Sequence, residues 1–368
     1  MQKVAQSWLV YRLTHSELLL GTAWFCSQIP VFALGPIGGV VCDRYSRHRI
    51  VIATQVLSML PAFALGVLTL AGHVKVWHIL ALALMLGTIN AFDMPARQAF
   101  IIELANKEDL LNAISLNSAI FNAARIVGPA IAGLLVAALG EGICFMVNGV
   151  SFLAVIAALA AMHVPHRVQP QPDSSWSHLV DGFRYAWHHV PVRSLLMLLG
   201  ATTLAGMPAL VLMPFFADEI FHHGSQGLGF LMGAMGVGAV IGTLVLAQRI
   251  ELSGLHRVII YSALATGASF ILFSASPWFY LSLAIMPVVG FGVMRQNAAA
   301  NTSIQMLIPD EYRGRIMSLY SMTVVGLGPF GSLTAGAVAH AVGPRWTVFA
   351  GGVMAVAAAW VFHWKTRE

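Results

Sequence analysis

The fold is decided by the stretch Gly39-Val40-Val41-Cys42-Asp43-Arg44-Tyr45-Ser46-Arg47-His48-Arg49, a short charged turn set between two long apolar runs. Charged side chains inside hydrocarbon carry a severe energetic cost, so we expect this turn at a membrane interface. Its three arginines also predict the side, because short loops rich in Lys and Arg stay in the cytoplasm. The chain is therefore expected to enter a membrane on both flanks of the turn.

The composition extends this expectation to the whole chain. Of the 368 residues, 58% are hydrophobic and only 10% are charged, and the mean hydropathy is +0.78. A soluble domain has about 25% charged residues, so this chain could not cover a globular surface. The net charge of +5 does not indicate nucleic-acid binding, because the basic residues lie in short turns rather than in a stripe. We predict an all-α polytopic membrane protein embedded in the lipid bilayer.

Apolar runs of about 20 residues, long enough to cross a 30 Å hydrocarbon core, recur along the chain. The first run, Val4 to Leu13, is too short for this, because about 13 residues of helix reach only roughly 20 Å. The sequence thus predicts eleven full spans and part of one. The full spans are expected at residues 17–41, 50–71, 76–96, 112–138, 142–163, 192–216, 226–248, 257–274, 278–300, 315–340 and 345–363.

The positions of the basic residues support this order of spans. If the charged turn is cytoplasmic, fifteen of the twenty Lys and Arg residues fall on the cytoplasmic side and three on the opposite side. The remaining two, Lys3 and Arg125, lie within spans. This split follows the positive-inside rule. It predicts a multi-pass protein of a bacterial-type inner membrane with a cytoplasmic C-terminus.

An internal repeat relates the two halves of the sequence. Glu108-Asp109 and, 202 residues later, Asp310-Glu311 are each followed five residues on by Ile, and Gly128-Pro129 recurs as Gly328-Pro329. Such repeats are typical of transporter folds built from two related bundles. The shift would place the start of the first span roughly 10–20 residues before Met1 if the halves are equal. We therefore expect the chain to lack the front of its first span.

The longest polar connection divides the predicted bundles. Within it, Trp176, Leu179, Val180, Phe183 and Trp187 share one helical face, which predicts an amphipathic helix at the membrane surface. The expected parts are an N-terminal bundle at 1–163, a cytoplasmic linker at 164–191 and a C-terminal bundle at 192–368.

With twelve intended spans, two six-span halves and a Gly-x3-Asp-Arg turn between spans two and three, the chain resembles the major facilitator superfamily over essentially its whole length. Ser46 replaces a glycine of the family's loop motif and His48 a basic residue, while five residues match it: Gly39, Asp43, Arg44, Arg47 and Arg49. Further stretches resemble the enterobactin-exporter-like branch of secretion and drug-efflux carriers. They are Val4-Ala5-Gln6-Ser7-Trp8-Leu9-Val10-Tyr11, Asp93-Met94-Pro95-Ala96-Arg97-Gln98-Ala99-Phe100 and Arg313-Gly314-Arg315-Ile316-Met317-Ser318.

This resemblance implies a secondary active transporter that exports a small amphipathic molecule, drug-like or a siderophore, by alternating access. It also implies proton antiport and a monomer. A transport-inactive truncated carrier or a membrane scaffold is the alternative. No phosphate-binding loop, HExxH pair or His-rich cluster is present, so we expect no cofactor, no metal and no enzymatic activity.

The charged turn is expected to act as a conformational latch that closes the cytoplasmic side. Asp43 ends span two, where a helix N-terminus or Arg97 can partner it, and Asp93 is expected to join Arg97. A turn that only fixes topology, with no role in gating, is the alternative. The latch candidates are Gly39, Asp43, Arg44, Arg47, Arg49, Asp93 and Arg97.

Arg125 is the only basic residue deep in a full span, so we expect it to face the interior or a wet cavity. It would bind an anionic substrate or pair with an acid. The resemblance implies that spans one, four, seven and ten line the substrate cavity. The cavity candidates, for each of which helix packing is the alternative, are Arg125, Asn90, Gln28, Asn117, Asn122, Asn297 and Asn301.

A helix-kink motif is predicted at Gly128, Pro129 and Gly133, because Gly and Pro permit a bend and close approach between membrane helices. These residues partly match the superfamily's antiporter motif in span five. The proton carrier is not identified, because no carboxylate is expected in the middle of a complete span.

Overall fold

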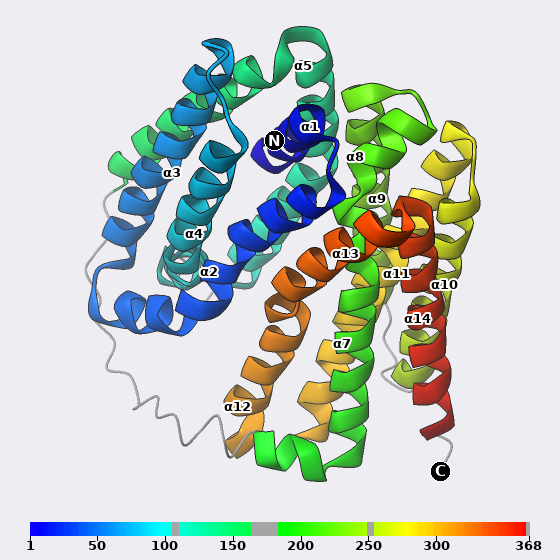
Figure 1. Ribbon diagram of the computed structural model, residues 1–368. Coiled ribbons are helices and arrows are strands. Elements are labelled where there is room, and N and C mark those ends of the chain that lie inside the picture. Colours follow the sequence, from blue (N-terminus) through cyan, green and yellow to red (C-terminus); the bar gives the residue numbers. More distant parts are fainter. Residues whose placement is uncertain (105–109, 163–182, 249–253, 366–368) are drawn as a thin grey trace. The chain divides into compact units, whose positions relative to one another are not determined.

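The computed structural model describes residues 1–104, 110–162, 183–248 and 254–365 (Figure 1). Within these ranges all regular secondary structure is helical, which confirms the predicted all-α class. The chain divides into two compact units, Met1–Pro172 and Asp173–Glu368. The amphipathic helix predicted in the linker lies mostly outside the described residues, and only its end at 183–188 is described as helical.

The N-terminal unit contains five described helices. Helix α2 packs against α4, α3 packs against both α4 and α5, and α1 packs against α5. Their bounds are α1 Gln2–Thr14, α2 Glu17–Arg44, α3 Arg47–Leu70, α4 Val76–Leu104 and α5 Leu110–Ala160.

The charged turn is shorter in the structure than the sequence predicts. Helix α2 continues to Arg44 and α3 already begins at Arg47, so only Tyr45 and Ser46 connect them. Tyr45 is extended, with φ −121° and ψ 160°. Polar residues at a helix end still make backbone hydrogen bonds, and charged side chains there can reach water. The charged segment therefore forms the adjoining ends of two helices.

Helix α5 comprises two of the predicted spans. It is 51 residues long, so it would extend about 76 Å, more than twice the thickness of a hydrocarbon core. Its backbone leaves the helical region at Gly140, where φ is 82° and ψ is 168°. L-residues rarely adopt such a positive φ, so the sequence supplies a glycine where the chain reverses.

From Val190 onward, the C-terminal unit contains eight described α-helices and two short π-helical segments. Helix α11 packs against both α9 and α10, and α14 packs against both α10 and α7. The bounds are α7 Val190–Val211, α8 Met213–Phe215, η1 Phe216–Ile220, α9 Gly224–Ala247, α10 Leu255–Ala275, α11 Phe279–Leu307, α12 Asp310–Ser321, η2 Met322–Gly326, α13 Gly328–Val342 and α14 Pro344–Lys365.

The number of spans agrees with the prediction. Ten stretches of the described chain are helical, long and apolar enough to cross a membrane, and one of them contains the break at Gly140. Dividing that stretch at Gly140 gives eleven. The short first run corresponds to α1, which has 13 residues.

The closest helix pair of each unit depends on glycine. In the N-terminal unit, a Cβ at Gly38 of α2 would meet the carbonyl of Ala91 on α4, and one at Gly87 of α4 would meet the carbonyl of Ser27. In the C-terminal unit, a Cβ at Gly238 of α9 would meet the carbonyl of Pro287 on α11, and one at Gly290 of α11 would meet the carbonyl of Met235 on α9. The repeat seen in the sequence thus recurs in the packing.

Large aromatic side chains at helix ends are exposed. Trp77, Tyr280 and Trp346 lie in the first turns of α4, α11 and α14, and each exposes more than half of its side chain. Amphipathic rings of this kind concentrate at the boundary between lipid and water. Their positions fit helices whose ends lie at a membrane surface.

Candidate functional site

Asp93 is the centre of a buried polar network between α3 and α4. Its Oδ1 accepts hydrogen bonds from Thr54 Oγ1 at 2.7 Å and Gln55 Nε2 at 2.9 Å. Its Oδ2 accepts from Arg97, at 2.8 Å from Nη2 and 3.2 Å from Nε. Both carboxylate oxygens are therefore satisfied, one by α3 and one by the next turn of its own helix.

The two partners in this ion pair differ in exposure. The side chain of Asp93 is 9% exposed, whereas that of Arg97 is 48% exposed. A buried carboxylate is stable only when charge and hydrogen bonds replace its lost hydration. Asp93 therefore depends on Arg97, Thr54 and Gln55, while Arg97 keeps partial access to solvent.

A second set of contacts ties the charged-turn end of the same unit together. Arg47 Nη1 lies 3.9 Å from Glu103 Oε2, which joins the start of α3 to the end of α4. His48 Nε2 lies 2.8 Å from the carbonyl oxygen of Leu159, near the end of α5. The His48 ring also stacks on Phe100, with centroids 5.5 Å apart. Three helices are thus cross-linked at this end.

The structure brings some of the predicted latch residues together. Asp93 and Arg97 form the expected ion pair, and Arg47 binds a carboxylate. Arg44 and Arg49 are exposed, and Gly39 has open space beside it. The side chain of Asp43 lies outside the described part of the structure. Sequence reasoning missed three partners, Thr54, Gln55 and Glu103, although each is a polar residue that interrupts an apolar run.

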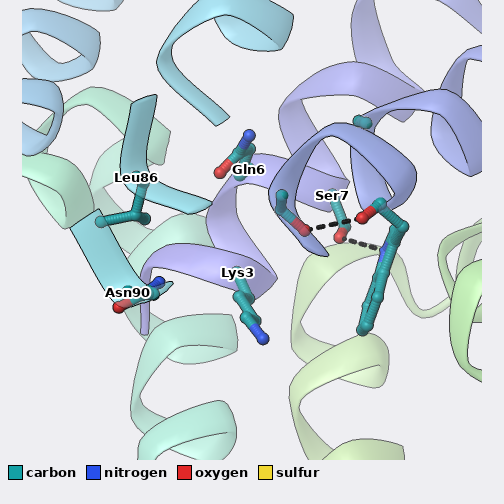
Figure 2. Close-up of a pocket in the computed structure, with 8 residues that line it drawn as sticks. Lys3, Gln6, Ser7, Leu86 and Asn90 are labelled. Carbon is teal, nitrogen blue, oxygen red and sulfur yellow. Dashed lines mark hydrogen bonds between the residues drawn. The ribbon is translucent and has the colours of Figure 1, made fainter. Parts of the chain in front are cut away.

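A hollow opens among α1, α2 and α4, and Figure 2 shows residues that line it. The empty space among its lining residues is about 410 Å³, a figure that includes space open to the surroundings, so the hollow is not an enclosed cavity. Asn90, one of the predicted cavity residues, lies fourteen residues from either end of α4, at the middle of that helix. The lining residues are Lys3, Gln6, Ser7, Ala23, Trp24, Ser27, Leu86 and Asn90, and we call this set the α1–α2–α4 hollow.

Trp24 forms a fixed aromatic wall of the hollow. Its indole N–H donates to Ser7 Oγ at 3.1 Å, and Ser27 Oγ donates to its carbonyl at 2.8 Å. Lys3 Nζ lies over the ring face, 5.8 Å from the ring centroid. An ammonium in this position is attracted to the negative face of an indole. Sequence reasoning placed Lys3 within a span but assigned it no role.

The other predicted cavity residues of the N-terminal unit lie outside the α1–α2–α4 hollow. Gln28 is half-buried on α2, and its Nε2 has no hydrogen-bond partner among the described residues. On α5, Asn117 and Arg125 are exposed and Asn122 is half-buried. The guanidinium of Arg125 lies 5.9 Å from the ring centroid of Phe121.

In the C-terminal unit, Asn297 and Asn301 lie half-buried on α11. The backbone carbonyl of Asn297 accepts a hydrogen bond of 3.0 Å from the Tyr320 hydroxyl on α12. The side chain of Asn301 accepts from Gln305, one turn along the same helix. The bond between Tyr320 and Asn297 links two helices, whereas the side-chain bond of Asn301 stays within α11.

The predicted kink motif lies in a regular part of α5. Residues 128–133 are helical, and the non-helical backbone described inside α5 is at Gly140. Gly133 is buried, and a Cβ at Gly128 would lie 3.9 Å from the nitrogen of Met1. The start of α1 therefore lies against α5 at Gly128.

The far end of the N-terminal unit is closed by an ion pair that the sequence did not predict. Arg12 on α1 binds Glu141 on α5 through Nε at 2.7 Å and Nη2 at 3.2 Å. Glu141 is 8% exposed in its side chain, and it directly follows the break at Gly140. Among the described residues, no group of three His, Cys, Asp or Glu side chains could hold a metal ion.

Comparison with known proteins places this arrangement among transporters. The sequence profile of a family described as transmembrane secretion effectors matches residues 1–367. The staphyloferrin A transporter of Staphylococcus aureus (strain NCTC 8325 / PS 47) is 24% identical over 369 residues, which cover 100% of this chain and 92% of the relative. The multidrug efflux pump Tap of Mycolicibacterium fortuitum is 27% identical, over 94% of this chain and 87% of the pump.

A solved structure shows a similar fold. The crystal structure of the nucleoside transporter NupG matches 100% of this chain and 96% of its own with a TM-score of 0.75 and 14% sequence identity. At this identity the likeness concerns the fold alone.

Proposed function

Since this chain belongs to the family of transmembrane secretion effectors, we propose that it is a secondary active transporter that exports a small amphipathic molecule by alternating access. The resemblance to the secretion and drug-efflux branch of the major facilitator superfamily is confirmed by this membership. The chain is a multi-pass membrane transporter with a small-molecule substrate. The proposal adds that it works as a monomer in a bacterial inner membrane, keeps its C-terminus in the cytoplasm and exchanges substrate for protons.

The α1–α2–α4 hollow is the observation that carries this proposal. Polar side chains inside membrane helices are costly, and in transporters they mark substrate sites near the bilayer midplane. Here Lys3, Ser7 and Asn90 border one hollow, and Asn90 lies at the middle of α4. Trp24 and Leu86 supply apolar surface to the same hollow. A ligand with both a polar and an apolar part matches this lining.

In the proposed mechanism, the Asp93 network and the Arg47–Glu103 pair stabilise one conformation of the charged-turn end. Separating α3 from α4 would remove the hydrogen bonds that Thr54 and Gln55 donate to the Asp93 carboxylate, each worth about 1.5–3 kcal/mol, while the ion pair with Arg97 stays within α4. A conformational change that separates α3 from α4 at Asp93 would therefore be disfavoured. The network would thus bias the transport cycle toward states in which these helix ends stay together.

Efflux of the uncharged amphipathic dye Nile red from loaded cells tests the proposal. Cells that express the chain should lose Nile red faster than cells with an empty vector, and a protonophore should abolish the difference. The variant Asn90→Leu, in the hollow, should slow efflux about tenfold, equivalent to 1.4 kcal/mol. The matched control Gln98→Leu, at an exposed position further along the same helix, should keep wild-type efflux.

Two results would contradict parts of this proposal. Efflux that persists when the proton gradient is collapsed would exclude proton antiport. No efflux of any amphipathic dye by a correctly inserted chain would favour a transport-inactive carrier or a membrane scaffold.

A further inference from the structure

Lys3 is a positive charge in the α1–α2–α4 hollow that has no anionic partner among the described residues. The described interaction of its ammonium is with the Trp24 ring, at 5.8 Å. A cation held within a membrane bundle is normally paired with an acid or exposed to a water-filled cavity. Lys3 is exposed and lines the hollow, so its charge is accessible from that space (Figure 2).

The carboxylates described near this hollow are engaged elsewhere. Asp93, one helical turn beyond Asn90 on α4, binds Arg97, Thr54 and Gln55. Glu141 binds Arg12 at the far end of the unit. Neither acid is available to Lys3 without the loss of its own buried contacts.

A second cation adds to the positive field at Lys3. Arg125, on α5, supplies a second positive charge near the start of α1. The packing agrees with this proximity, because the start of α1 lies against Gly128, which is three residues beyond Arg125 on α5. Two like charges near one hollow raise the local potential for an anion.

The rest of the lining fits an uncharged, partly flat group. The Trp24 indole is held by its hydrogen bond to Ser7, so the ring is already in place at the hollow without the ligand. Leu86 lies one helical turn before Asn90 on α4, and both border the hollow (Figure 2). The side-chain amide of Asn90 has no hydrogen-bond partner among the described residues, so it can donate to a ligand oxygen.

We propose that the α1–α2–α4 hollow binds a carboxylate attached to an aromatic or other flat apolar body. The carboxylate accepts from Lys3 and Asn90, and the apolar body packs on Trp24 and Leu86. This inference rests on the proposed export function, because it names the chemical class of the exported solute. It assigns Lys3 as the residue that selects anions.

Direct binding to the purified full-length chain in phosphatidylcholine nanodiscs tests this assignment. The probes are 2-naphthoate and its uncharged analogue 2-naphthamide, which differ in charge but hardly in shape, and isothermal titration calorimetry measures both affinities. Wild type should bind the acid at least about tenfold more tightly than the amide, a difference of 1.4 kcal/mol. Lys3→Gln should remove this preference, and Lys3→Arg should retain most of it.

Three controls make the result specific. Lys75→Gln removes an exposed lysine from the loop between α3 and α4 and should leave both affinities unchanged. Trp24→Ala should weaken acid and amide equally, because it removes the apolar surface and keeps the charge. Nanodiscs with half phosphatidylglycerol should give the same affinities, since the site is assigned to a solute and not to an anionic lipid headgroup.

Several outcomes would overturn the proposal. They are equal binding of acid and amide by wild type, a preference that survives in Lys3→Gln, or loss of naphthoate binding in anionic nanodiscs. Failure of the export function is read separately, from efflux in cells. Nile red efflux without an anion preference would refute the Lys3 site alone, and an anion preference without efflux would refute the transport proposal alone.

Discussion

The Asp93–Arg97 pair yields a prediction about stability, because its two partners should differ in how much their replacement destabilises the protein. Arg97→Gln should destabilise the protein more than Asp93→Asn, although each variant removes the same ion pair. After Arg97→Gln, the carboxylate of Asp93 stays 9% exposed with only Thr54 and Gln55 as donors. After Asp93→Asn, the remaining charge is on Arg97, which is 48% exposed and can be hydrated.

The magnitudes follow from these exposures. A buried charge that loses its partner costs about 3–5 kcal/mol, and two neutral donors on Asp93 reduce this to roughly 3 kcal/mol for Arg97→Gln. Asp93→Asn removes the charge-assisted hydrogen bonds to Arg97, but water can still hydrate the Arg97 guanidinium. We therefore expect this variant to cost about 1.5 kcal/mol. The double variant leaves no unpaired charge, so it should be no less stable than Arg97→Gln alone.

Thermal unfolding in detergent, followed by circular dichroism, measures the three variants. Arg97→Gln should lower the Tm by roughly 6–12 °C and Asp93→Asn by about half of that, on the scale of 2–4 °C per kcal/mol. Arg49→Gln is the matched control, because Arg49 is exposed at the same end, and it should shift the Tm by less than about 1 °C. Equal losses for the two variants, or a larger loss for Asp93→Asn, would refute this reasoning.

Three further perturbations have defined outcomes. Gly38→Ala places a methyl group against the Ala91 carbonyl and should lower the Tm by several degrees, whereas Gly39→Ala, with open space beside it, should be neutral when both are compared by the same melts. Glu141→Gln leaves half-exposed Arg12 without its anion, and a cost of about 1–2 kcal/mol should appear as faster trypsin cleavage after Arg12. Trp24→Phe keeps an aromatic face but loses the bond to Ser7, so it should cost about 1 kcal/mol in the melts and leave 2-naphthoate binding within about threefold.

The sequence predicted the features that a single segment encodes. Each span was visible as an apolar run, and the Asp93–Arg97 pair followed from spacing, because residues four apart lie on one helix face. The charged turn was predicted too long, since Arg44 already belongs to α2 and Arg47 to α3.

Features that join different helices could not be derived in the same way. Thr54 and Gln55 meet Asp93 only because α3 packs against α4, and Glu141 meets Arg12 across 129 residues of sequence. The spacing of residues along the chain does not indicate which helices pack together, so it does not predict such contacts. Lys3 was missed for a similar reason, because its significance depends on the Trp24 ring of the next helix.

The glycines between α2 and α4, and between α9 and α11, have a consequence for motion. At Gly38 and Gly238 a carbonyl of the facing helix occupies the space that any side chain would need, and this close contact resists sliding of the two helices past each other. Each unit therefore contains at least one helix pair that behaves as a rigid strut. Spectroscopic labels across either strut would keep a constant separation while the protein changes conformation. Distances measured from the struts would then provide a fixed internal frame for following every other helix.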